Sequence, residues 1–469
     1  MLVTRRPVTE SFLIAVVCAA AVVAVGVGAA VQPMYGAAGL AAATGVCFVW
    51  ARPVYAAYIL VGVVPIASGL DRGVPIPGFR LSELLTVGLA GVLLVSLDHR
   101  RDARWRALDW AAIAYVAAHV VMGVLGSYNE GRPVVNGDLG TLVGPAQYFV
   151  YFRALALVLQ TEEMRSRALT FLLGSSVVIS VSVIVDKFVP GVRPTLHDLT
   201  GYSVFPGDGQ SVSRASGLFP HFQVASGYLA SIVIASAAAF LNGYRTMPRL
   251  ALAFVCALAG VALVQTVTLT TLLGAAAGVL VLAAWHTDRR RNLAIALISL
   301  AAVGAVFSPV LLARVNEQGA VAVGTLGANR NPLVPQTVAY RWEIWTTQSL
   351  PALSDRLYVG AGPTLPNTMT WKSTESMYMT LLFRGGVPLL AVWLILWYTM
   401  LRTAWRGRYS PDETQRIAAK ALTVLLVFLV VMQNIQPYLT YGGISHVVWL
   451  LAAIVVIPFR ARSSSPTAL

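Results

Sequence analysis

Charged side chains are scarce in this chain. Asp, Glu, Lys and Arg make up 12% of its 469 residues, and the apolar types Ala, Val, Ile, Leu, Met, Phe, Trp, Tyr and Cys make up 57%. Soluble domains carry about 25% charged residues. A soluble protein of this size cannot hide so much apolar surface, because even a 300-residue domain leaves about a quarter of its unfolded surface exposed. The composition therefore excludes a soluble or disordered chain and predicts a protein embedded in lipid.

Cysteines and cofactor motifs are equally rare. Cys18, Cys47 and Cys256 lie singly inside apolar runs, so the sequence gives no support for a disulfide or zinc framework. The sequence has no GxxxxGK[ST] loop, and the segments that we expect outside the cytoplasm have no DxD, HxxxH or HExxH motif. We therefore expect neither ATP nor a metal ion as a cofactor.

Apolar runs dominate the chain. A helix that crosses about 30 Å of hydrocarbon needs about 17–25 apolar residues, and lipid forces such runs to be helical. We predict an all-α polytopic membrane protein with about 12–14 transmembrane helices, and we read the first run as a retained anchor rather than a signal peptide. The predicted spans are 11–31, 36–50, 54–69, 81–97, 108–126, 141–160, 168–186, 216–241, 250–266, 268–285, 292–310, 377–400, 417–434 and 443–459.

The basic residues predict the orientation. With both termini in the cytoplasm, 21 of the 34 Lys and Arg residues fall in cytoplasmic loops, as the positive-inside rule requires. The chain then divides into an N-terminal bundle (1–310), one large extracytoplasmic loop (311–376) and C-terminal spans (377–469). The loop is rich in aromatic residues, and its stretch 336–350 can form an amphipathic helix.

Twelve basic residues remain on the predicted outer side, where positive charge is normally depleted. The basic residues form no continuous patch, so lipid headgroups or an anionic substrate are better partners than nucleic acid. Arginine binds phosphate oxygens bidentately, so several of them could hold a diphosphate. The alternative is that individual residues snorkel to lipid headgroups. The residues are Arg72, Arg80, Arg132, Lys187, Arg193, Arg214, Arg314, Arg330, Arg341, Arg356, Lys372 and Arg384.

Two of these arginines lie in segments that suggest a site. Arg214 precedes a long span, and a helix N-terminus with an arginine attracts anions; the alternative is an interface anchor. His221, deeper in the same segment, could relay a proton or simply pack. Arg341 lies four residues before Trp345, on one helix face, and follows Tyr340. Such aromatic residues fit sugars or phosphates, but they also fit an interfacial belt.

Glu375 and Ser376 begin the span that follows the large loop. A carboxylate at the mouth of an apolar helix tends to have a raised pKa, which suits a general base acting on a hydroxyl. The alternative is that Glu375 complements the positive end of its own helix.

Four short motifs, in this order and with this sidedness, resemble the O-antigen ligase and Wzy-type polymerase superfamily of bacterial envelopes. The resemblance covers about residues 80–390, and the hydropathy layout matches over nearly the whole chain. The motifs are Phe79-Arg80-Leu81-Ser82-Glu83, then Arg214-x-Ser216-Gly217-x-Phe219-Pro220, then Arg341-x-x-x-Trp345 leading to Gly360-x-Gly362, and finally Ser376-x-Tyr378-x-x-x-Leu382-x-x-x-Gly386.

This resemblance implies a GT-C-like O-antigen ligase fold in the bacterial plasma (inner) membrane. It also implies transfer of a glycan from an undecaprenyl-diphosphate carrier to an acceptor hydroxyl, with inversion and without metal. By position, Arg214 and Arg341 would bind the diphosphate. Glu375 takes the place of the family's histidine, which is a departure from the pattern.

The sequence therefore predicts a glycosyltransferase with a polyprenyl-diphosphate-linked glycan as donor and a glycan or lipid-glycan as acceptor. A transporter or flippase for an anionic lipid-linked glycan is the alternative, and a non-catalytic scaffold is a third interpretation. The candidate catalytic residues are Glu375, Arg341 and Arg214. The candidate substrate-binding residues are Arg314, Lys372, Tyr340, Trp345, His221, Ser376 and Arg80.

Overall fold

The computed structural model describes residues 44–45, 47–48, 51–70, 80–98, 105–201, 214–320, 336–369 and 374–457. These residues form α-helices, short π and 3-10 segments and connecting turns, and no strand occurs among them. The predicted all-α class is confirmed. The elements are α3 (Pro53–Ala67), α4 (Leu81–Leu85), η1 (Thr86–Ala90), α5 (Gly91–Asp98), α6 (Ala107–Asn129), α7 (Asn136–Val158), α8 (Glu162–Phe188), α9 (Arg193–Thr200), α10 (Phe222–Leu241), α11 (Arg249–Gln265), α12 (Leu269–Ala284), α13 (Arg289–Val306), α14 (Ser308–Ala320), α16 (Gln336–Ile344), η2 (Trp345–Ser349), α17 (Leu350–Leu353), α18 (Met377–Gly407), α19 (Glu413–Met432), η3 (Tyr438–Thr440) and α20 (Gly442–Val456).

Each predicted span from 54–69 onward coincides with a helix or a run of helical segments. Six of the described helices are long and apolar enough to cross a membrane, and α13 with α14 forms a seventh candidate that is bent by 67°. Five further apolar helices are shorter, α3, α11, α12 and α20 among them. The predicted spans 11–31 and 36–50 lie almost entirely outside the described residues. The chain is a multi-pass membrane protein.

The core of the bundle is α10, which is buried along almost its whole length. It contacts α8, α11, α12, α19 and α20. Its sequence is rich in Ala and Ser, and such small residues let helix backbones approach closely in lipid. The hydroxyls of Ser231 and Ser236 donate to the carbonyls of Gly227 and Ile232 inside the same helix, so they need no partner elsewhere.

Two buried ion pairs hold the bundle together. Arg153 in α7, which the sequence places inside a span, donates to Asp109 in α6 over 3.2 Å. Arg165 in α8 pairs with Asp412, which caps α19. A buried charge is costly unless it is paired, so these pairs explain how arginines are tolerated here.

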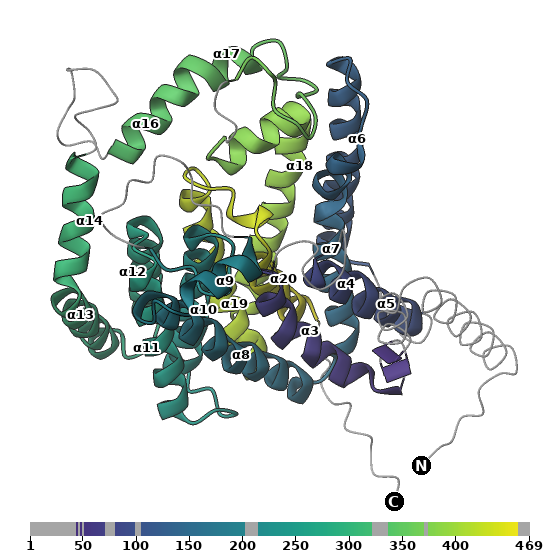
Figure 1. Ribbon diagram of the computed structural model, residues 1–469. Helices are drawn as coiled ribbons and strands as arrows, with labels where there is room; N and C mark the ends of the chain where they lie inside the picture. The colour runs from purple at the N-terminus through teal and green to yellow at the C-terminus, as the bar shows by residue number, and fades with distance from the viewer. Residues whose placement is uncertain are drawn as a thin grey trace, which may run out of the picture.

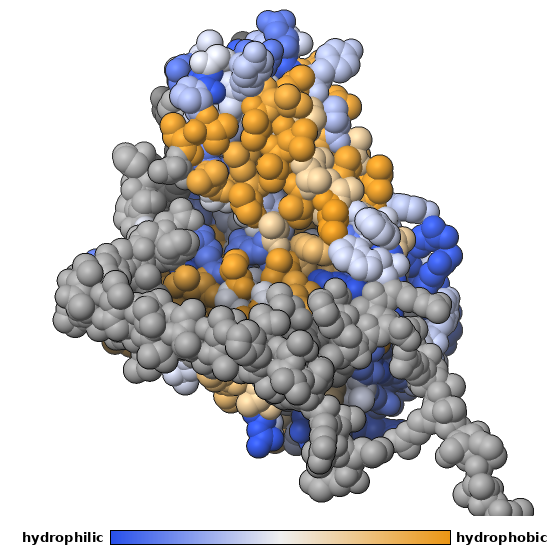
Figure 2. Space-filling view, turned by 90° about the vertical axis from the view of Figure 1, so that its right-hand side faces the viewer, coloured by the Kyte–Doolittle hydropathy of each residue, from blue (hydrophilic) through white to orange (hydrophobic). Residues whose placement is uncertain are grey.

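The outer surface of α6 is apolar. Figure 2 shows an apolar area on this face with polar side chains beyond its upper end. The exposed apolar side chains of α6 suit contact with lipid tails. They are Trp110, Val121, Val124 and Leu125.

In the segment between α13 and α18, the described residues 308–320, 336–369 and 374–376 lie over one end of the bundle and are called the arch below (Figure 1). α14 rises from the bend after α13, and α16, η2 and α17 continue toward the ends of α18 and α6. The predicted amphipathic helix at 336–350 is confirmed as α16 with η2. This arch carries Arg341 and Trp345, and it positions them beside the beginning of α18.

Candidate functional site

Arg341 and Glu375 meet at the point where the arch joins α18. Nη2 of Arg341 lies 2.8 Å from Oε2 of Glu375, and both side chains are largely shielded from solvent, with exposed fractions of 11% and 17%. The indole of Trp345 donates from Nε1 to the carbonyl of Thr374 over 3.2 Å. The arch and the approach to α18 are thus joined by two polar contacts, and two of the three predicted catalytic residues lie side by side.

The backbone of Glu375 is strained. Its φ angle is 47°, in the left-handed region that residues other than glycine seldom adopt. Such a conformation costs about 1–3 kcal/mol and is concentrated at functional sites. The next residues resume a regular structure, since Ser376 is the N-cap of α18 and the amide of Met377 donates to the carbonyl of Gln433 over 2.8 Å.

The environment of Glu375 shifts the pKa of its carboxyl group above the ordinary value. Burial raises the pKa of its carboxyl group, and the nearby Arg341 guanidinium opposes that shift only in part. A carboxylate with a raised pKa can take a proton from a hydroxyl more effectively than an ordinary glutamate. Arg341 can therefore hold the carboxylate of Glu375 in a fixed position and adjust its pKa.

The turn before α20 supplies the neighbouring polar groups. Tyr438 lies within electrostatic range of Arg341, and Tyr441 lies within range of Glu375. The hydroxyl of Tyr441 donates to Oε1 of Gln436 over 3.0 Å. The side-chain amide of Gln433 is buried, with no partner at hydrogen-bond distance among the described residues. Unpaired buried polar groups are costly, so this amide is suited to binding a polar ligand.

Arg214 precedes a turn that the carboxylate of Asp186 organises. Oδ2 of Asp186 accepts hydrogen bonds from the amides of Ser216 and Gly217 at 2.7 and 3.0 Å. Arg193 donates to the carbonyl of Arg214 at 3.1 Å, and its Nε lies 3.6 Å from Oδ1 of Asp186. Gly217 has a φ angle of 58°, and a Cβ there would lie 2.7 Å from the amide nitrogen of Val183. The second motif is therefore a turn that only glycine allows.

Arg214 and His221 both lie at the beginning of α10. The guanidinium of Arg214 stacks on the ring of Phe222, with Cζ 4.3 Å from its centroid. Nδ1 of His221 accepts a hydrogen bond from the amide of Gln223 at 3.3 Å, so His221 caps α10. Tyr438 packs on the same end of α10, because a Cβ at Gly227 would lie 2.8 Å from its ring. Arg214 and the Arg341–Glu375 pair thus adjoin the same helix end through Phe222 and Tyr438.

The remaining candidates are placed differently. Arg314 lies on α14, which contacts α16. Ser376 is buried, and its carbonyl accepts hydrogen bonds from the amide and the hydroxyl of Thr380. Lys372 and the side chain of Tyr340 lie outside the described residues. Arg80 lines a separate cavity.

Two of the arginines predicted on the outer side serve the structure of the arch itself. Arg132, in the turn after α6, donates to the carbonyls of Ala361 and Thr364 at 3.0 and 3.1 Å. Arg356 pairs with Glu130 in the same turn. Not every arginine predicted on the outer side is therefore available to a ligand, because these two connect the arch to α6.

The Gly360-x-Gly362 motif completes this connection. A Cβ at Gly360 would lie 2.6 Å from the amide nitrogen of Gly385, and the amide of Ala361 donates to the carbonyl of Phe383 at 2.5 Å. α18 is kinked there, with a φ angle of 66° at Gly386. The third and fourth motifs are thus in direct contact, and the kink helps to determine where the adjacent side chain, Arg384, is presented.

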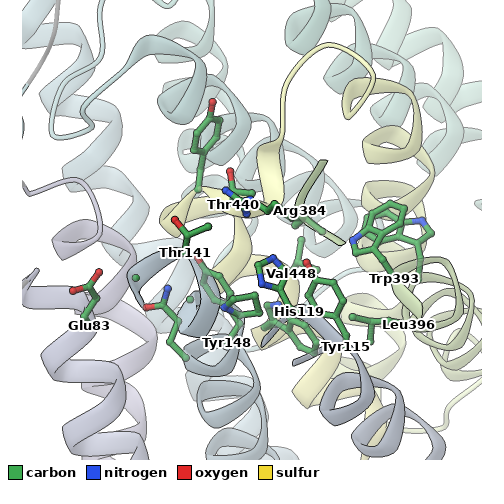
Figure 3. A pocket seen from close by; sticks show the side chains of 18 of the residues that line it. Glu83, Tyr115, His119, Thr141, Tyr148, Arg384, Trp393, Leu396, Thr440 and Val448 are labelled. Carbon is green, nitrogen blue, oxygen red and sulfur yellow. The ribbon is translucent and has the colours of Figure 1, made fainter. Parts of the chain in front are cut away.

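A cavity of about 400 Å³ lies between α4, α6, α7, α18 and α20 (Figure 3). Arg80, His119, Arg384 and Tyr441 are among its lining residues. The sequence motifs assigned no site role to His119, Arg384 or Tyr441. The available signal was an ionisable residue inside an apolar run, which marks a candidate functional residue in membrane proteins. Within the described residues, no group of three or more His, Cys, Asp or Glu side chains could hold a metal ion.

Residues 253–394 match the family model Wzy_C, described as O-antigen ligase. The matched region begins in α11 and ends in α18, so it contains the arch, Arg341, Glu375 and Arg384. It does not include Arg80, Arg214 or His221. No curated protein matches the chain.

Proposed function

Because the chain belongs to the O-antigen ligase and Wzy polymerase superfamily, we propose that it transfers a glycan from a polyprenyl-diphosphate carrier to an acceptor hydroxyl. The predicted family resemblance is confirmed. Family membership implies a ligase- or polymerase-type glycosyltransferase with a lipid-linked glycan and a glycan acceptor as substrates. The carrier, the inverting and metal-independent mechanism and the roles of individual residues are our proposal.

The observation that carries the proposal is the contact between Arg341 and Glu375. Glu375 accepts the proton of the acceptor hydroxyl while the hydroxyl oxygen attacks the anomeric carbon. The bond from that carbon to the diphosphate oxygen breaks, and the lipid diphosphate leaves with the bonding electrons. Attack from the face opposite the leaving group inverts the anomeric centre.

Fixed cations support the departure of the diphosphate in this proposal. A guanidinium has five N–H donors, more than one carboxylate oxygen uses, so Arg341 can orient Glu375 and also bind phosphate oxygens. Arg214 is the second candidate, and Arg314 on α14 and Lys372 are further candidates. One well-placed donor contributes about 3–4 kcal/mol to such a step, which explains how the reaction could proceed without a metal ion.

We propose that the arch lies on the outer face of the bacterial plasma membrane and that both chain termini lie in the cytoplasm. The excess of basic residues in the opposite loops supports this orientation. Accessibility of a cysteine introduced at exposed Trp342 on α16 to a membrane-impermeant reagent in intact cells tests it.

A transfer assay tests the proposed function. The purified protein in lipid nanodiscs is incubated with a defined polyprenyl-diphosphate oligosaccharide and an acceptor glycan, and the products are weighed by mass spectrometry. We expect a product heavier by one donor glycan, loss of turnover with retained donor binding in Glu375→Gln, and slower transfer in Arg341→Ala. Glu343→Gln, an exposed position on α16, is the matched control.

Two results would contradict the proposal. Movement of the lipid-linked glycan across a bilayer without any transfer would favour the flippase alternative. Full activity of Glu375→Gln would leave the transferase assignment intact but would remove the proposed base.

A further inference from the structure

The cavity lined by Arg80, His119 and Arg384 is not used by the proposed reaction step. Its wall also contains Tyr441, which lies within electrostatic range of Glu375. The cavity is therefore a neighbour of the Arg341–Glu375 pair and shares one tyrosine with it. At about 400 Å³, it falls within the usual range of small-molecule sites, roughly 300–1,000 Å³.

Arg384 brings a positive charge into this cavity. It lies directly before the kink at Gly385 and Gly386, whose contacts with Gly360 fix the local backbone. No carboxylate among the described residues pairs with Arg384, and its electrostatic neighbours include Tyr115 and His119. A cation inside a membrane protein is costly without an anionic partner, so the site lacks a counter-charge that a ligand could supply.

Other groups around the cavity also lack partners. Nε of Arg80 and Nε1 of Trp397 are buried, with no partner at hydrogen-bond distance within the described part of the chain. His119, which is 1% exposed, lies in the same lining. Arginine and tryptophan nitrogens can only donate, so the unpaired groups call for a ligand that is rich in hydrogen-bond acceptors. Figure 3 shows His119 and Tyr115 close together at the cavity, with Trp393 beside them.

The one carboxylate in the lining does not remove this preference. Glu83 accepts a hydrogen bond from the backbone amide of Arg80 at 3.2 Å, in the first turn of α4. Its charge is thus placed at the positive end of a helix, where carboxylates are stabilised. The cavity contains two arginines and one glutamate, so its lining is positive overall.

The remaining lining is apolar and aromatic. Trp393 and Trp397 stack on each other with centroids 5.0 Å apart, and Leu396, Met400 and Val448 continue the wall. A ligand that fits both the positively charged lining and this apolar wall has an anionic group next to an apolar face or chain. A sugar ring with an acidic substituent and a lipid phosphate both have this character.

We propose that this cavity binds an oxyanion of the substrate, and that Arg384 is the residue that makes binding depend on the charge. The proposal rests on the glycan-transfer function and extends it, because it predicts that the substrate carries a second recognised anion besides the diphosphate held near Arg341. The oxyanion belongs either to an acidic sugar of the glycan or to a lipid phosphate. Either source would satisfy the donors of Arg384 and Arg80.

Two pairs of probes distinguish the sources. Purified protein in nanodiscs is titrated with glucuronate against glucose, and with farnesyl phosphate against farnesol, while its melting temperature and its binding isotherm are recorded. We expect the anionic member of at least one pair to bind and stabilise the protein more than its neutral partner. A preference within the first pair identifies an acidic sugar, and a preference within the second identifies a lipid phosphate.

Arg384 variants test the assignment. Arg384→Gln should abolish the preference for the anionic probe, with an affinity loss of about tenfold or more, as expected for a charge-assisted hydrogen bond. Without ligand it should melt no lower than the wild type, because it removes an uncompensated charge. Arg384→Lys should retain part of the preference. Arg402→Gln, at an exposed position on the same helix, should match the wild type.

The proposal is overturned if neither anionic probe is preferred, or if Arg384→Gln keeps the preference. It is also overturned if Arg384→Gln melts well below the wild type while Arg384→Lys melts normally, since the charge would then stabilise the fold rather than a ligand. Because binding is measured without transfer, a protein that binds the anion through Arg384 but transfers no glycan would overturn only the proposed function.

Discussion

Oε2 of Glu375 lies 2.8 Å from Nη2 of Arg341, although one residue precedes α18 and the other lies on the arch that covers it. This contact relates the basicity of the candidate base to the position of the arch. Withdrawal of α16 would remove the charge that favours the ionised carboxylate. The activity of Glu375 should therefore depend on arch closure, which makes its pH dependence informative.

The first prediction concerns the pH dependence of glycan transfer. Burial raises the pKa of Glu375 above its ordinary value, and Arg341 lowers it in part. A base must be ionised, so the rate should fall as the pH decreases through a midpoint above the ordinary glutamate value of about 4.3. Arg341→Gln should shift that midpoint to higher pH, and Arg341→Lys should shift it less. The measurement is kcat as a function of pH in nanodiscs. An unchanged midpoint in Arg341→Gln would show that Arg341 does not influence the pKa of the group that limits the rate.

The second prediction concerns the glycine that precedes α10. Gly217 combines a positive φ angle with contacts from Ser182 and Val183, so Gly217→Ala should lower the melting temperature and disturb the position of Arg214. Gly174 is the matched control, because it lies exposed inside α8 and a Cβ added there would have no neighbour within 4 Å. Gly174→Ala should stabilise the protein by about 0.5–1 kcal/mol. If the two substitutions had equal effects on melting temperature and on glycan transfer, the turn before α10 would not require glycine at position 217.

The helical architecture was predictable because apolar runs in lipid leave the backbone one local solution. Arg341 and Glu375 were predicted separately, each from its place beside an apolar span or an aromatic cluster. The roles of Arg132 and Arg356 were not predictable, because their partners Ala361 and Glu130 are brought near them only by the fold of the arch. Arg384 was recognised only as an outer charge, since the cavity that it lines is built from helices far apart in the sequence.

The third prediction concerns the connection between the arch and α6. Arg356 pairs with Glu130, and that carboxylate raises the pKa of the guanidinium. Arg356→Gln and Glu130→Gln should each loosen the arch, reduce transfer several-fold and increase proteolytic cleavage between α16 and α18. Because the two residues act through one contact, the double variant should lose little more than either single variant. A fully additive double variant, measured in the same transfer and proteolysis assays, would show that they act independently.

The fourth prediction concerns the buried pair of Arg153 and Asp109. The two side chains are 7% and 2% exposed, and their atoms approach to 3.2 Å. Arg153→Met leaves a buried carboxylate without its cation, which should cost about 3–5 kcal/mol. Asp109 also accepts a hydrogen bond from the amide of Arg106 at 2.8 Å, and Asp109→Asn keeps an acceptor for that amide. The double variant Arg153→Met with Asp109→Asn should therefore melt at a higher temperature than Arg153→Met alone. Melting temperatures of the three variants in one detergent provide the comparison. A double variant that is less stable than both single variants would show that the two side chains do not compensate each other's buried charge.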